Sequence, residues 1–194
     1  NSSNASANNT YAIRFDYGTD LVTTANSALS GTNATSTSDP YYTQEYTWLR
    51  SCNQLIEKGK EYTNPSEIEG PIGQAYFFRA WHHFFLLQRF GGITLMLSTP
   101  DVSSEALWGP RNSRYEVIKS ILDDLDMAIE KLHNTTVATT NNDGHVTLEA
   151  AKAFKARVCL YEGTWEKYNG IGTEDETNGD GVKSGAGTVI PEDY

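Results

Sequence analysis

The stretch Gln74–Gly92, QAYFFRAWHHFFLLQRFGG, is the most apolar and most aromatic part of this chain. It has no glycine or proline before its final Gly91-Gly92 pair, and such a pair is expected where a helix stops. Its apolar side chains fall on several adjoining faces, whereas a surface helix would show one stripe. The sequence therefore predicts a helix of about five turns in the middle of a bundle.

Three further helices are expected around it, over residues 42–59, 114–132 and 148–168. Each shows apolar residues at the 3–4 spacing that produces a buried face. Ser113 stands at the N-cap position of the second of these, and Ser66 at that of the central helix. Between the central helix and Ser113, the sequence predicts a short extended run that ends at Pro100.

Short connections favour antiparallel neighbours, so the four helices are expected to form two antiparallel pairs. Helix pairs stacked in this way are the architecture of tetratricopeptide solenoids. The predicted fold class is therefore all-α, a bundle of tetratricopeptide-like helix pairs with long irregular loops. We expect a polar, loop-rich segment at 1–40, a helical core at 41–168 and an acidic, glycine-rich loop at 169–194.

The chain is acidic, with 15 Lys and Arg against 25 Asp and Glu, a formal net charge of −10. Nucleic acid and anionic lipid are not attracted to such a surface, whereas neutral ligands such as sugars are compatible with it. No apolar run reaches the roughly 18 residues of a membrane span. Cys52 and Cys159 lie in apolar helical patterns typical of buried thiols, although spacing alone leaves a disulfide open.

Four residues are expected in the structural core: Asn53, Phe78, Arg79 and Phe85. Asn53 lies on an apolar stripe, which indicates a hydrogen-bonded amide. Arg79 lies inside the central helix, so a buried ion pair with an acid of the third helix is favoured over a ligand contact.

No metal site, cofactor site or catalytic group is expected from the chemistry-bearing side chains. His82 and His83 are adjacent, so they point about 100° apart on a helix, and no third ligand is suitably spaced. Asp123 and Asp126 share the solvent face of an amphipathic helix, which does not suit a catalytic carboxylate pair in one pocket.

Four motifs follow one another in the sequence: the helix from Tyr46 to Asn53, the segment QAYFFRA through FGGI at 74–93, the helix after PRNS at 110–113, and the helix after GHVT at 144–147. Together, across about residues 40–168, they resemble the motifs of the SusD/RagB family. The departures are modest. Gln74 replaces the usual Glu, Thr94 the usual Pro, and histidines stand where Tyr is common.

The resemblance implies a non-enzymatic lipoprotein of the outer-membrane surface. It would bind an oligosaccharide and act as a lid on a TonB-dependent transporter of the SusC type. Its membrane attachment would be peripheral, through a lipid anchor absent from this chain. Family members are more than twice as long, so the chain is expected to be an internal, N-terminal-side fragment.

A glycan site needs aromatic faces and polar side chains that share hydroxyl hydrogen bonds. In the family these residues come largely from loops near the first helix pair. The candidates are Asp20, Asp39, Tyr41, Tyr42 and Trp108. None lies in a shared motif, and helix-start packing is an open alternative for Tyr42, as is capping of the core for Trp108. The alternative function is a transporter-docking scaffold whose sugar site lies outside this fragment.

Overall fold

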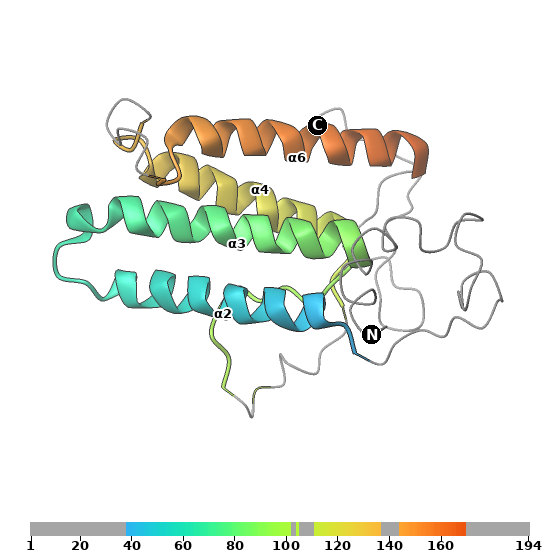
Figure 1. Cartoon of the computed structure of the whole chain (residues 1–194), viewed down its shortest axis with the longest axis horizontal. Helices are drawn as coiled ribbons and strands as arrows, with labels where there is room; N and C mark the ends of the chain where they lie inside the picture. The colour runs from blue at the N-terminus through green and yellow to red at the C-terminus, as the bar shows by residue number, and fades with distance from the viewer. Residues whose placement is uncertain (1–37, 102–103, 105–110, 137–143, 170–194) are drawn as a thin grey trace, which may run out of the picture. The chain divides into compact units, whose positions relative to one another are not determined.

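The computed structural model describes residues 38–101, 104, 111–136 and 144–169. These residues form four α-helices, α2 (Pro40–Lys60), α3 (Glu69–Phe90), α4 (Arg114–Lys131) and α6 (Leu148–Asn169), and one 3-10 turn, η1 (Pro65–Glu67). Figure 1 shows that successive helices run antiparallel, with α3 between α2 and α4 and with α6 along α4. The predicted all-α fold class is confirmed for the described part of the chain.

The central helix α3 begins at Glu69, three residues after the predicted cap at Ser66. Pro71 sits in its first turn, where the missing N–H costs no hydrogen bond. The predicted Ser66 cap is wrong, because Ser66 belongs to η1 and Ile68 occupies the N-cap without a side-chain bond. At the other end Gly91 has φ 71° and donates its N–H to Leu87 O, which ends the helix as expected.

Helix α4 begins with the cap that the sequence predicted. The Ser113 hydroxyl accepts a hydrogen bond from the Glu116 N–H at 3.1 Å, and the Glu116 carboxylate accepts one from the Ser113 N–H at 2.9 Å. This reciprocal capping box satisfies two backbone donors. It fixes the start of α4 immediately after the extended segment that follows α3.

The core lies where α3 meets α4 and α6. Two predicted core residues differ from expectation: Phe78 is 40% exposed, and Phe85 is only half-buried. Their neighbours Phe77 and Phe84 are buried instead, with ring centroids 5.4 and 5.6 Å from that of Phe154 on α6. A helix that is apolar nearly all round cannot reveal which face its partners cover, so the prediction for Phe78 was wrong by one position, about 100° of rotation.

Both cysteines are half-buried free thiols, so no disulfide joins them. Burial raises the pKa of the Cys52 thiol to about 11. Among the described residues, no helix is long and apolar enough to cross a membrane.

Candidate functional site

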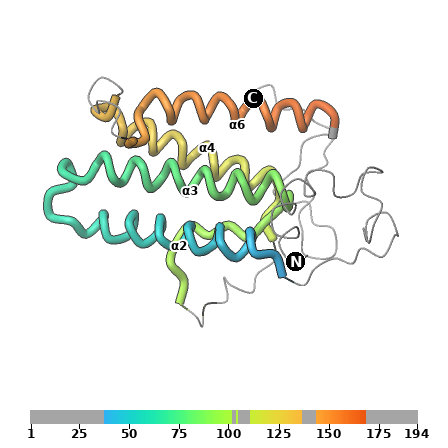
Figure 2. Tube along the Cα trace, in the orientation of Figure 1, coloured from blue at the N-terminus to red at the C-terminus, as the bar shows by residue number. Residues whose placement is uncertain are grey.

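A groove lies between the first half of α2 and the segment that follows α3. Tyr42, Tyr46 and Arg50 recur at a spacing of four residues, so they share one face of α2. The segment after Gly92 turns back along α2 (Figure 2), and its alternate residues Thr94, Met96 and Ser98 complete the lining together with Pro100. The groove encloses about 300 Å³.

Asn53 ties this extended segment to α2. Its side-chain amide donates to Met96 O at 2.8 Å and to Ser98 O at 2.9 Å. The residue is fully buried, and its own oxygen accepts from Arg79 Nη1 at 2.9 Å. The prediction that this mid-helix amide is satisfied by structural hydrogen bonds is confirmed.

Arg79 joins three parts of the fold. Its guanidinium contacts Asp124 on α4 through two bonds, Nε to Oδ2 at 2.8 Å and Nη2 to Oδ1 at 2.5 Å. Its Nη1 also donates to Leu97 O at 3.1 Å. Burial raises the pKa of the Asp124 carboxyl, and the guanidinium opposes that rise. The expected ion pair with an acid of the third helix is confirmed, and the bond to Leu97 O links it to the segment that lines the groove.

The two adjacent histidines are structural, as their position on α3 indicated. His83 is fully buried, and burial together with the Arg79 charge lowers its pKa to about 3, so its imidazole is neutral. Its Nε2 accepts from Met96 N–H at 3.4 Å. His82 points to a different partner, with Nδ1 2.6 Å from Glu45 Oε2. In the described residues no group of three potential ligands could hold a metal ion.

Tyrosine hydroxyls and a guanidinium line the groove, and of these the guanidinium of Arg50 is the donor suited to hydroxyl-rich ligands. The Tyr46 hydroxyl donates to Thr94 O at 2.6 Å and accepts from Tyr42 at 3.3 Å, and burial raises its pKa, so it keeps its proton. The Arg50 side chain is exposed and makes no hydrogen bond within the described part of the chain. A guanidinium in that state can donate to two neighbouring oxygen atoms of a ligand.

Among the residues that the structure describes, one of the five predicted ligand residues lies in this groove. Tyr42 lines it, and it also performs the alternative role of helix-start packing, with its ring centroid 5.2 Å from that of Phe90. Tyr41 is 51% exposed, with the Arg89 guanidinium 4.6 Å from its ring centroid. Asp39 is half-buried just before α2.

Asp20 and Trp108 lie outside the described residues, and so do almost all of the expected segments 1–40 and 169–194. The helical core expected at 41–168 falls largely within the described ranges. Asp123 and Asp126 are exposed on α4, and Asp126 pairs with Lys155 at 2.5 Å. The prediction of a solvated acidic face there is confirmed.

Comparison with known proteins identifies the family. A family model described as starch-binding and associating with the outer membrane, SusD-like, matches residues 2–160. The chain belongs to the SusD-like family. SusD-like protein P38 of Formosa agariphila is 30% identical over 124 residues, which are 64% of this chain and 23% of that protein.

Solved structures of SusD-like proteins share the fold. One from Bacteroides fragilis has 27% sequence identity and a TM-score of 0.59, over 78% of this chain and 27% of its own. A laminarin-binding SusD-like protein has 22% identity and the same TM-score, over 71% of this chain and 29% of its own. The chain thus spans about a quarter of the length of the SusD-like relatives that it matches.

Sequence reasoning missed Tyr46 and Arg50 as groove residues, because Tyr46 was assigned to the buried stripe of α2. The 42–46–50 spacing was a usable signal, since it places two tyrosines and an arginine on one helical face. What the sequence could not supply was the partner surface. The hydrogen bonds from Asn53 and Tyr46 to backbone carbonyls of the segment after α3 show that this segment lies against that face.

Proposed function

We propose that the SusD-like protein to which these residues belong captures oligosaccharides at the outer-membrane surface and acts without catalysis. The family supports the class of function, because its model is described by starch binding and outer-membrane association. The groove between α2 and the segment 93–100 supports a location. It combines tyrosine rings with an uncommitted guanidinium, which are the groups that a sugar ring and its hydroxyls require.

The chemistry of each groove side chain favours a particular role in binding a sugar. The Tyr42 ring offers an apolar surface for the face of a sugar ring, while Arg50 donates to a pair of neighbouring hydroxyls. Thr94 and Ser98 add short hydroxyls along the opposite wall. A neutral glycan also suits a chain whose net charge is −10, because it meets no long-range repulsion.

The test is calorimetric titration of the full-length protein with a panel of neutral oligosaccharides. We expect Arg50→Ala and Tyr42→Ala each to weaken binding by about tenfold, because each removes contacts worth roughly 1.5 kcal/mol. Arg157→Ala on the exposed face of α6 and Tyr168→Ala near its end are the matched controls. Unchanged binding in both groove variants would remove the site from this groove.

A second candidate function is docking of a membrane transporter, and the exposed aromatic residues of α2 and α3 favour it. Trp48, Phe78 and Trp81 are 50%, 40% and 42% exposed. Large apolar side chains exposed together are typical of interaction surfaces. The partner we propose is a TonB-dependent transporter of the SusC type, with the protein held at the membrane by a lipid anchor.

These two functions separate experimentally. Trp81→Ala and Phe78→Ser should reduce co-purification with the transporter while leaving glycan binding unchanged, because neither residue lines the groove. Glycan binding that falls in these variants and persists in Arg50→Ala would place the sugar platform on the exposed aromatic residues instead.

A further inference from the structure

A second pocket lies at the end of the bundle where α2 and α4 finish and α3 begins. The antiparallel order brings these three termini together, and they contribute Lys60, Lys131 and Glu69. The space between them is about 200 Å³. It is separate from the groove at Tyr42, because the two share no lining residue.

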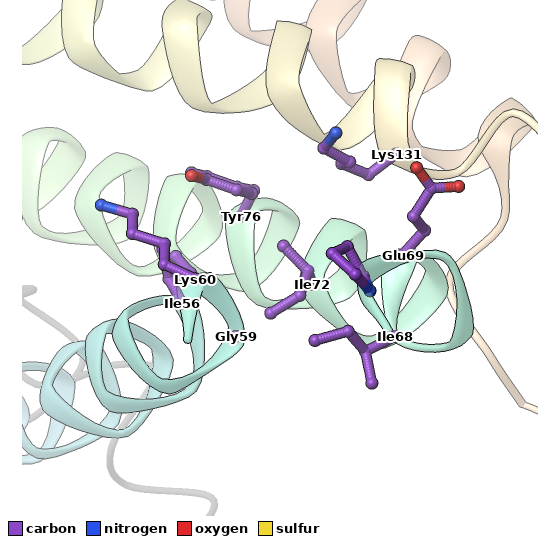
Figure 3. A pocket seen from close by; sticks show the side chains of 9 residues that line it. Ile56, Gly59, Lys60, Ile68, Glu69, Ile72, Tyr76 and Lys131 are labelled. Carbon is purple, nitrogen blue, oxygen red and sulfur yellow. The ribbon is translucent and has the colours of Figure 1, made fainter. Parts of the chain in front are cut away.

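The inner surface of this pocket is aliphatic. Figure 3 shows Ile56 from α2 with Ile68 and Ile72 at the start of α3 grouped along one side of it. Gly59 allows the close approach, since a Cβ there would come within 2.3 Å of the Ile72 side chain. The surface lacks the open aromatic face and the ring of polar groups that a sugar needs, so it favours a branched or straight aliphatic group.

The opening of the pocket carries cationic and hydroxyl donors. Lys60 is exposed and makes no hydrogen bond or ion pair in the described part of the chain. Lys131 pairs with its exposed neighbour Glu130 at 3.2 Å, a contact that contributes little. The Tyr76 hydroxyl likewise has no hydrogen-bond partner among the described residues, and Figure 3 places it on the same side of the isoleucines as the Lys60 ammonium.

The charge of the lining contrasts with that of the chain. Two lysines and one glutamate line the pocket, in a chain of net charge −10, although Glu130 beside Lys131 and Glu57 near Lys60 offset part of the positive charge. In Figure 3 the Glu69 carboxylate lies on the opposite side of the pocket from Lys60. An anion beside Lys60 and Tyr76 is thus attracted by the Lys60 ammonium and kept apart from the Glu69 carboxylate.

We propose that this pocket binds an aliphatic carboxylate, with the hydrocarbon group against the three isoleucines and the carboxylate held by Lys60 and Tyr76. The ligand chemistry has two sources, a free short fatty acid and the C-terminal residue of a peptide that ends in an aliphatic side chain. Both present one carboxylate next to a hydrocarbon group of the size that the pocket admits. The proposal does not rest on glycan binding at the other groove.

The experiment is a titration of the full-length protein, followed by NMR, with 4-methylpentanoate and with its uncharged amide. We expect the carboxylate to bind at least about tenfold more tightly than the amide, because only the carboxylate makes a charge-assisted hydrogen bond. Lys60→Met should remove that preference and Tyr76→Phe should reduce it. Lys58→Met, an exposed lysine of the same helix turn, is the matched control and should retain the preference.

One further ligand, N-acetyl-leucine, distinguishes the sources. N-acetyl-leucine that binds more tightly than 4-methylpentanoate indicates a peptide C-terminus, and the reverse order indicates a free fatty acid. Equal binding of acid and amide, an equal effect of Lys58→Met and Lys60→Met, or the absence of any shift at Ile68 and Ile72 would overturn the proposal.

Discussion

Two buried arginine–carboxylate pairs connect the helices, and their surroundings differ. Arg79 on α3 holds Asp124 on α4 and also reaches Asn53 and Leu97 O, so the pair belongs to a satisfied network. Arg114 on α4 holds Glu162 on α6 through bonds of 2.7 and 2.5 Å. One turn beyond Glu162 lies Glu166, only 2% exposed, whose Oε2 has no hydrogen-bond partner among the described residues.

The difference arises because the Arg114 guanidinium neutralises one of its two neighbouring carboxylates, Glu162, and leaves the other, Glu166, without a bonded partner among the described residues. Burial and repulsion from Glu162 raise the pKa of Glu166 to about 7, and Arg114 opposes the rise only in part. Arg114 is committed to Glu162, and it lies over the Trp165 ring at 4.0 Å. The pair at Arg79 thus gives a fixed charge arrangement beside the groove, whereas the pair at Arg114 leaves a carboxyl group that titrates near neutral pH.

The largest expected effect comes from removing the guanidinium of the satisfied network. Arg79→Met should lower the free energy of unfolding by about 4 kcal/mol near neutral pH, because Asp124 becomes a buried, unpaired charge and the Asn53 oxygen loses its donor. Urea denaturation followed by circular dichroism measures it. Arg157→Met on the exposed face of α6 should change stability by less than about 0.5 kcal/mol. A similar loss in both variants would contradict the network.

Arg114→Met should cost less, about 3 kcal/mol, because Arg114 donates only to Glu162 among the described residues, whereas Arg79 also donates to Asn53 and Leu97 O. The sign follows from the Arg114 charge, which lowers the pKa of both Glu162 and Glu166, so that its removal raises both pKa values further in the folded state. A raised carboxyl pKa gives stability that is full below the unfolded value and is lost as pH rises from there to the folded value. The deficit of Arg114→Met should therefore be larger at about pH 8 than at about pH 5. Equal deficits at both would contradict the explanation.

Asn53→Leu tests whether the network also shapes the groove. It removes the donors to Met96 O and Ser98 O and leaves Arg79 with one fewer acceptor, so we expect a loss of about 2 kcal/mol in the free energy of unfolding. Without these two bonds the segment that lines the groove opens more often, so hydrogen exchange at Met96 and Ser98 should accelerate. Thr47→Ala on the exposed side of α2 is the control. Stability loss without faster exchange would separate the network from the groove.

The sequence predicted one of these two pairs because of where the arginines lie. Arg79 stands in the middle of an apolar helix, where a charge requires a partner. Arg114 is the first residue of a helix, and Glu162 lies in a helix of mixed polarity, so both look like ordinary surface residues. Whether Arg114 and Glu162 form a pair depends on how α4 packs against α6, and the periodicity within each helix does not contain that information.

The same limit explains the core and the candidate site. Helix positions, the Ser113 cap and the family motifs depend on local sequence and were predicted well. The sequence predicted Phe78 in the core, whereas Phe77 lies there, because the face of α3 that meets α6 is the one that carries Phe77. The groove at Tyr42 and Arg50 depends on a backbone segment distant in the sequence, which Asn53 holds at Met96 O, 43 residues further along the chain.

The smallest expected effect isolates the unpaired carboxyl group beside Arg114. Glu166→Gln keeps the size of the side chain and removes the penalty of ionising it, so it should stabilise the protein by about 1 kcal/mol at about pH 8, a value reduced for solvent screening. The advantage should disappear at about pH 4, where Glu166 is protonated in both states. Denaturation at both pH values measures the difference, and Glu61→Gln, at an exposed position just after the end of α2, should show none. A gain that does not depend on pH would mean that the introduced amide finds a hydrogen-bond partner, and that ionisation of Glu166 costs the fold nothing.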